Sequence, residues 1–110
     1  MQACQVTVAA GSPDEARRVA DALLDARLAA CVQVVGPVES RYWWQGVQES
    51  ATEWLCLAKT RSDLLDPIVT AVRRVHSYDT PEVVAVPILG GDPAYLAWLD
   101  GEASAGGGTP

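Results

Sequence analysis

Several short stretches of the chain alternate apolar residues with small or polar ones at a period of two, which is the pattern of a β-strand. The clearest stretch is 5–10, where Val6 and Val8 stand between small or polar neighbours. Similar patterns predict strands at 30–35 and 82–89. They also predict a long hairpin made by residues 39–44 and by the chain from residue 47 onward.

Two segments instead carry apolar residues at helical spacing. The first is predicted to begin at Ser12 as N-cap, with Pro13 at the first helical position and Glu15 completing a capping box. Its predicted buried stripe consists of Ala16, Val19, Ala20, Leu23, Leu24 and Leu28. The second helix lies within residues 62–76, and Asp66 with Pro67 is a cap pair from which its regular part is expected to begin.

Glycine and proline predict where the strands turn and end. Gln45-Gly46 predicts the tight turn of the hairpin, with Trp43 and Trp44 near its tip, because glycine adopts positive φ without strain. Gly36-Pro37 predicts a bend or break in the second strand, and Pro87 predicts a sheet edge or a bulge.

The order of these elements is strand, helix, strand, strand, helix, strand. Two right-handed crossovers joined in this way predict an α/β (α+β) ferredoxin-like βαββαβ sandwich, an antiparallel sheet with both helices on one face. Asp92-Pro93 is expected to start a short C-terminal helical turn. The expected organisation is one domain over residues 1–102, followed by a disordered Gly-rich tail at 103–110.

The predicted third and fourth strands are apolar on both faces. Trp54, Cys56 and Ala58 point one way while Leu55 and Leu57 point the other, and residues 83–86 are apolar throughout. An uncovered apolar face is unusual in a soluble monomer. The pattern therefore predicts that a second copy of the chain covers this face, without giving the number of copies.

Composition narrows the function. The chain of 110 residues has 14 acidic and 8 basic residues, a net charge of −6, and a single histidine, His76. This acidic balance argues against nucleic acid as a partner, and therefore against an RNA-recognition module of the same strand order. The sequence contains no asparagine, which argues against an acylphosphatase, whose phosphate-cradling loop needs one.

The three cysteines, Cys4, Cys31 and Cys56, are an odd number and contain no C-x-x-C pair. A disulfide scaffold or a structural zinc site is therefore not expected, and reduced thiols predict a cytoplasmic protein. Cys31 and Cys56 are expected to act as small buried hydrophobic residues, and Cys4 to be the most exposed. No signal peptide and no membrane-spanning segment is predicted.

Five motifs in order resemble the CutA divalent-cation tolerance proteins. They are the runs LAACV at 28–32, YWWQG at 42–46, KTR at 59–61, YDTPE at 78–82 and GDPAYLAWL at 91–99. The resemblance covers nearly the whole chain. It implies a ferredoxin-like homotrimer linked to tolerance of copper and other divalent cations. No enzymatic activity is expected, because none of the three cysteines has a histidine partner nearby in the sequence. The alternative that the resemblance leaves open is a trimer similar to the PII signalling proteins, which senses a small metabolite or anion without a direct role for metal.

His76 is the candidate metal ligand, because the family motif places histidines here and a neutral imidazole suits copper or zinc. The chain departs from the family at two positions. Val75 replaces one histidine of the usual pair, and Ala10 replaces a cysteine that ligates copper in some members. A structural role, with the ring packed at the end of the helix, is the competing interpretation.

Lys59, Tyr78, Glu82 and Trp44 are the candidate ligand-binding residues. The resemblance implies that Lys59, Tyr78 and Glu82 line a cleft between subunits, where Lys59 and Glu82 either form an ion pair or help to hold a small anion or metal complex. Trp44 and its aromatic neighbours at the hairpin tip either stack on a ligand or anchor the next subunit, and the second role is favoured.

Overall fold

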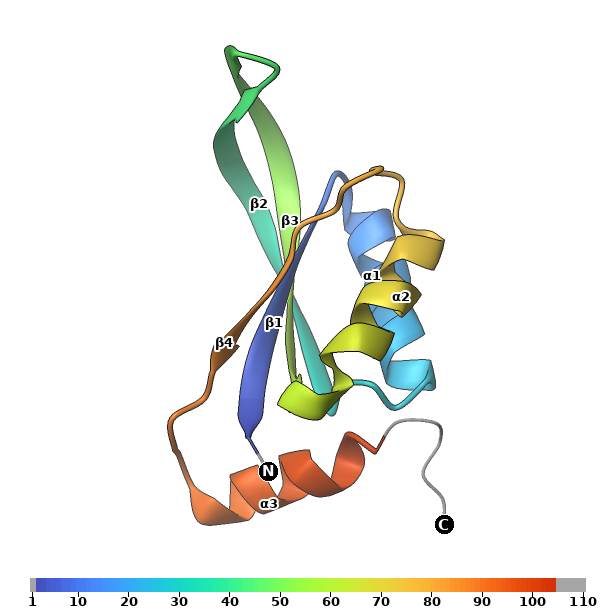
Figure 1. Cartoon of the computed structure of the whole chain (residues 1–110), viewed down its shortest axis with the longest axis vertical. Helices are drawn as coiled ribbons and strands as arrows, with labels where there is room; N and C mark the ends of the chain where they lie inside the picture. Colours follow the sequence, from blue (N-terminus) through green and yellow to red (C-terminus); the bar gives the residue numbers. More distant parts are fainter. Residues whose placement is uncertain (1, 105–110) are drawn as a thin grey trace.

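The computed structural model describes residues 2–104 and confirms the predicted ferredoxin-like architecture. Four strands form one antiparallel sheet in the order β2-β3-β1-β4. The helices α1 and α2 lie together against one face of this sheet (Figure 1). The elements are β1 (Ala3–Ala10), α1 (Pro13–Asp25), β2 (Cys31–Trp44), β3 (Val47–Arg61), a 3₁₀ turn η1 (Ser62–Leu64), α2 (Leu65–Val75), β4 (Val83–Pro87) and α3 (Pro93–Glu102).

The core lies between the sheet and the two helices. Val6 and Val8 of β1 pair in register with Ala58 and Cys56 of β3, and all four side chains are buried beneath the helices. Cys4 belongs to the same buried row, so the prediction that it is the most exposed cysteine was wrong. Alternation along β1 places residue 4 on the helix-covered face despite its position near the chain start.

The start of α1 follows the predicted capping, with one difference. The Ser12 hydroxyl accepts a hydrogen bond from the Glu15 N–H at 3.1 Å. The Glu15 carboxylate does not return to Ser12, as a capping box requires, but accepts from the N–H of Gly11 at 3.3 Å. Leu24 was expected in the buried stripe and is 40% exposed, because it lies on the flank of the helix.

The helix α2 begins two residues earlier than the predicted cap pair indicates. Its first residue is Leu65, it follows η1 directly, and no side chain caps it. Asp66 and Pro67 therefore lie inside the first turn. Pro67 is tolerated there because the first N–H groups of a helix have no intrahelical acceptor.

The hairpin of β2 and β3 is longer than its sequence pattern indicated, and it extends past the ends of β1 and β4 (Figure 1). Gly36-Pro37 does not end β2, because β3 pairs with it on both sides of a register shift between Val35 and Val38. A Cβ atom at Gly36 would overlap the indole ring of Trp54. The turn is as predicted, with φ values of 50° at Gln45 and 81° at Gly46.

The C-terminal helical turn is a complete helix of ten residues, α3, which lies across the end of the sheet opposite the hairpin tip (Figure 1). Asp92 caps it by accepting from the Tyr95 N–H. Ala103 is buried, and the Ser104 N–H donates to the Arg27 carbonyl at 3.0 Å. Residues 103 and 104, which were predicted to belong to a disordered tail, are therefore packed against the rest of the fold, and residues 105–110 lie outside the described residues. Within the described part, no helix is both long and apolar enough to cross a membrane.

The face of the sheet opposite the helices is apolar in its centre, as predicted. Val84 and Val86 of β4 are 54% and 55% exposed, and Leu55 and Leu57 of β3 are half-buried. The strand β1 lies between them and contributes Gln5, Thr7 and Ala9 to the same face. Cys31 lies on this face, half-exposed, and is not the buried residue that was expected. We call this surface the open face; its β3 residues are Glu53, Leu55, Leu57 and Lys59.

Candidate functional site

The candidate site is a cleft of about 620 Å³ under the extended part of the hairpin. Tyr42 and Trp44 line it from β2, and Glu49 and Glu53 line it from β3. The segment 78–82 between α2 and β4 closes the other side with Tyr78, Asp79 and Glu82. Three of the four predicted ligand-binding residues, Trp44, Tyr78 and Glu82, therefore lie in one cleft.

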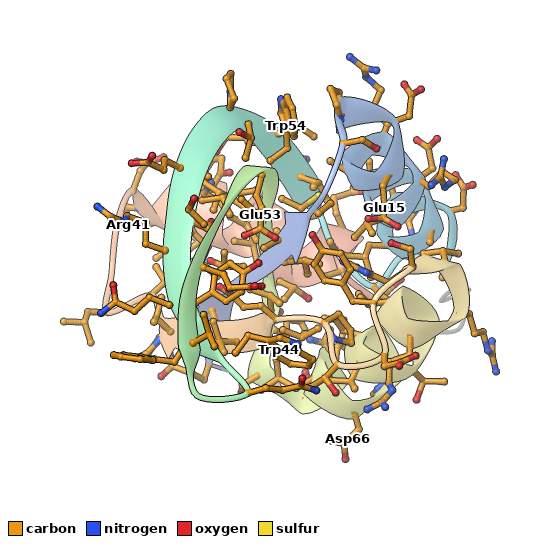
Figure 2. The ribbon with its side chains drawn as sticks, turned by 90° about the horizontal axis from the view of Figure 1, so that it is seen from above. Glu15, Arg41, Trp44, Glu53, Trp54 and Asp66 are labelled. Atoms are coloured by element: carbon orange, nitrogen blue, oxygen red, sulfur yellow. The ribbon has the colours of Figure 1, made fainter. Side chains whose placement is uncertain are left out.

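Glu53 is the central buried charge of the cleft. Its carboxylate points inward beneath the hairpin, whereas Trp54, the next residue, points to the opposite side of the strand (Figure 2). Only 8% of Glu53 is exposed, and its Oε2 accepts a hydrogen bond from the Tyr78 hydroxyl at 3.0 Å. No ion pair joins Glu53 to a base anywhere in residues 2–104.

The Tyr78 hydroxyl is held in its neutral form by this environment. Burial, followed by the hydrogen bond to Glu53 and its charge, raises the pKa of Tyr78 to about 12. A neutral phenol donates one hydrogen bond to Glu53, and its oxygen can still accept. The pair therefore presents oxygen acceptors, which suit a cation better than an anion.

His76 lies behind the cleft rather than in it. Its Nε2 is 2.7 Å from the Ala9 carbonyl, which only accepts, and its Nδ1 is 3.1 Å from the Tyr78 N–H, which only donates. The ring is therefore the neutral tautomer with its hydrogen on Nε2. Both nitrogens are engaged within the chain and its side chain is fully buried, so this geometry offers no nitrogen lone pair to a metal ion.

Glu15 ties α1 to the segment that carries Tyr78. Its Oε2 accepts from the Ser77 N–H at 2.8 Å, while Oε1 accepts from the Gly11 N–H. Burial raises the pKa of Glu15, but the hydrogen bonds from Ser77 and Gly11 outweigh this effect and hold the pKa below its ordinary value. A charged, buried carboxylate thus fixes the start of residues 77–82.

Lys59 is absent from the cleft formed by its own chain. It lies six positions after Glu53 along β3, at the other end of the open face. Its Nζ donates to the Gln33 side-chain carbonyl at 2.8 Å. The predicted ion pair between Lys59 and Glu82 does not form within the chain, because Glu82 stands at the cleft end of the sheet.

No metal centre assembles from one copy of the described chain. Residues 2–104 contain no group of three or more His, Cys, Asp and Glu side chains that could hold a metal ion. The thiols of Cys4 and Cys56 belong to the core, and burial raises the pKa of Cys56 to about 11. The described part of one copy therefore offers no ready set of three ligands for a metal ion.

The aromatic residues at the hairpin tip remain largely uncovered. Tyr42, Trp43 and Trp44 are 42%, 68% and 57% exposed. Tyr42 and Trp44 turn toward the cleft, while Trp43 lines the other side of the hairpin. Arg41 extends outward from the hairpin in Figure 2 and is the one base lining the cleft.

Sequence reasoning missed Glu53 and Glu15 as site residues. Glu53 opens the apolar run of β3 and falls on the same alternating face as Leu55 and Leu57. A carboxylate on a face that a second copy was predicted to cover could have marked Glu53 as a site residue. Glu15 had a local explanation as a helix cap, and its contact with Ser77 depends on a tertiary arrangement that spacing does not show.

The chain is similar to proteins of one family throughout the described region. Residues 4–102 match the family model for the CutA1 divalent ion tolerance protein. A divalent-cation tolerance protein CutA from Archaeoglobus fulgidus is 41% identical over 95 residues, which are 86% of this chain and 92% of the relative. A chloroplastic protein CutA 1 from rice is 43% identical over 94 residues, again 86% of this chain.

The chain spans about half the length of the plant relatives that it matches, 53% of the rice protein and 52% of one from Arabidopsis thaliana. Solved structures agree with the fold. The crystal structure of CutA1 from Oryza sativa superposes with a TM-score of 0.89 at 39% identity, covering 93% of this chain and 94% of that one. A CutA structure from Archaeoglobus fulgidus, described as periplasmic, gives 0.88 at 39% identity, covering 92% and 98%.

Proposed function

Because the chain belongs to the CutA1 divalent ion tolerance family, we propose that it acts in the response to divalent cations as a homotrimer. In this proposal a cation, copper among them, is bound in the cleft at a boundary between subunits. The protein binds and does not catalyse. The cytoplasmic location expected from its reduced thiols stays a prediction.

The observation that carries the cation-binding proposal is the charge of the cleft. Glu49, Glu53, Asp79 and Glu82 line it, and Arg41 is the one base among the lining residues. Such a surface attracts cations and repels anions. This charge balance favours the cation role over the alternative of a PII-like trimer that senses an anion.

The trimer is supported by the open face and by the hairpin. Val84, Val86 and the half-buried leucines of β3 form an apolar surface with no cover in a single chain. Burying it against other copies removes apolar area from water at about 25 cal/mol per Å². The exposed aromatic residues at the hairpin tip suit a contact with a neighbouring subunit.

The trimer and the cation site depend on each other in this proposal. The described residues of one chain bring together no set of three close ligands, so in this proposal a neighbouring copy contributes to the coordination. Carboxylate and water oxygens from two copies are ligands for divalent cations. His76 acts by positioning, since its two hydrogen bonds hold the backbone at Ala9 and Tyr78 beside the cleft.

Calorimetric titration with Cu²⁺ tests this function. We expect Glu82→Gln to weaken binding to the assembled protein at least about tenfold, because Glu82 lines the cleft and has no hydrogen-bond partner within the described residues. Asp21→Asn, which removes an exposed carboxylate from α1, serves as the matched control and should bind as the wild type does. Equal affinity in wild type and Glu82→Gln, or no heat from any of them, would contradict the cation role. Binding of inorganic phosphate instead would support the PII-like alternative.

A further inference from the structure

The open face of β3 carries opposite charges at its two ends. Alternation along the strand places Glu53, Leu55, Leu57 and Lys59 on this face, with the acid in the cleft and the base at the far end. Six residues of extended chain separate them by about 20 Å. They are therefore too far apart to pair within one copy, and two leucines lie between them.

Each of these charges lacks an ionic partner within residues 2–104. Glu53 is buried, and its one hydrogen bond comes from the neutral Tyr78 hydroxyl. Lys59 donates to the neutral amide of Gln33. The next base on the same face, Arg61, is already paired with Asp63 at 2.8 Å and lies near Asp100. Lys59 is thus the base of the open face whose charge is uncompensated in the described chain.

Covering the open face changes the environment of both charges. An ammonium group and a carboxylate that are taken out of water each lose their hydration, and they recover this loss only by meeting an opposite charge. The open face offers one uncompensated charge of each sign. In a ring of identical subunits every interface joins two different patches of the same surface, so one patch can bring the base and the other the acid.

We propose that Lys59 of a neighbouring copy reaches into the cleft and pairs with Glu53, so that the cleft is incomplete in a single chain. The inference rests on the proposed homotrimer and names the group that the second copy supplies. It leaves Glu82, Glu49 and Asp79 as the free carboxylates of the cleft. It also gives a role to Lys59, which lies outside the cleft of its own chain and donates only to the neutral amide of Gln33.

Charge exchange tests the pairing by sedimentation equilibrium of the full chain. We expect Lys59→Glu and Glu53→Lys each to weaken self-association at least about tenfold, because each places like charges in contact. The double variant should recover association to within about threefold of wild type, since the opposite charges meet again. Arg74→Glu, a charge reversal at an α2 residue on the far side of the sheet, is the control and should leave association unchanged.

Two neutral substitutions, Lys59→Met and Glu53→Gln, test the same pairing without requiring the fold to tolerate a reversed charge. If Glu53 and Lys59 interact, Lys59→Met should weaken the association of the wild-type chain. Added to Glu53→Gln, which has already lost the ion pair, the same substitution should change association little. The pairing would be refuted if Lys59→Met weakened association equally in wild type and in Glu53→Gln. It would also be refuted if the double charge exchange associated no more strongly than the weaker of the two single variants. Either result would leave the trimer intact. A wild-type chain that sediments as a monomer would refute both the pairing and the proposed assembly.

Discussion

Leu57→Glu is expected to convert the protein into a folded monomer. Leu57 stands in the centre of the open face, between Thr7 of β1 and Gln33 of β2. In a single chain the new carboxylate reaches water, because this position is only half-buried. In the trimer each copy would bury a carboxylate in an apolar contact, at a cost of several kcal/mol per ion. Sedimentation equilibrium measures the assembly, and circular dichroism measures the fold.

Leu24→Glu is the matched control for this substitution. Leu24 is also a partly exposed leucine, but it lies on α1, on the helix side of the sheet. We expect the control to fold and to assemble as the wild type does. If Leu57→Glu assembled as well as Leu24→Glu, another surface would hold the subunits together, and the role assigned to the open face would be wrong.

Glu15→Ala is expected to lower the free energy of unfolding by about 2–4 kcal/mol. The substitution removes two part-buried hydrogen bonds, from the N–H groups of Gly11 and Ser77 to the Glu15 carboxylate, and a hydrogen bond to a charged group contributes about 1.5–3 kcal/mol. The segment 77–82 also loses its link to α1, so cation binding in the cleft should weaken together with stability. Urea denaturation measures the first effect and calorimetry the second.

The stability that Glu15 contributes should depend on pH in a defined direction. The pKa of Glu15 is lower in the folded chain than in the unfolded chain. The difference in free energy of unfolding between wild type and Glu15→Ala is therefore fully present above about pH 4.3. It decreases as the pH falls through the lower folded value. Asp14→Ala removes the neighbouring carboxylate, which is exposed and pairs only with Arg17, and it should leave the unfolding midpoint near that of wild type. A difference between wild type and Glu15→Ala that stayed constant down to pH 2 would contradict the assigned role.

The fold was predictable because local pattern and tertiary structure agree in most of this chain. Alternation predicted that Trp54, Cys56 and Ala58 share one face of the third strand, and the structure shows that the helices cover this face. The turn at Gln45 and Gly46 fixed the pairing of the hairpin. Predictions differed from the structure where tertiary contacts outweighed the local sequence pattern. Asp66-Pro67 predicted the start of the second helix, yet α2 follows η1 directly and begins at Leu65. Gly36-Pro37 predicted a bend or break in β2, and the strand has a register shift there while its pairing with β3 continues on both sides.

The site was predictable only in part. Trp44, Tyr78 and Glu82 meet in the cleft, but their shared position depends on how far the hairpin extends over residues 78–82. The chemistry of His76 is decided by two backbone groups, at Ala9 and Tyr78, that no sequence spacing reveals. An imidazole suits a metal in general, whereas this one is fully used inside the fold.

The native mass of the wild-type chain tests the central claim most directly, because the open face, the cleft and the pairing of Lys59 all depend on other copies. Light scattering on the purified protein should give three times the 11.7 kDa of one chain over a wide range of concentration. A single species of 11.7 kDa would contradict the account, because the open face would then be exposed to water and the cleft would have to function with the residues of one copy alone.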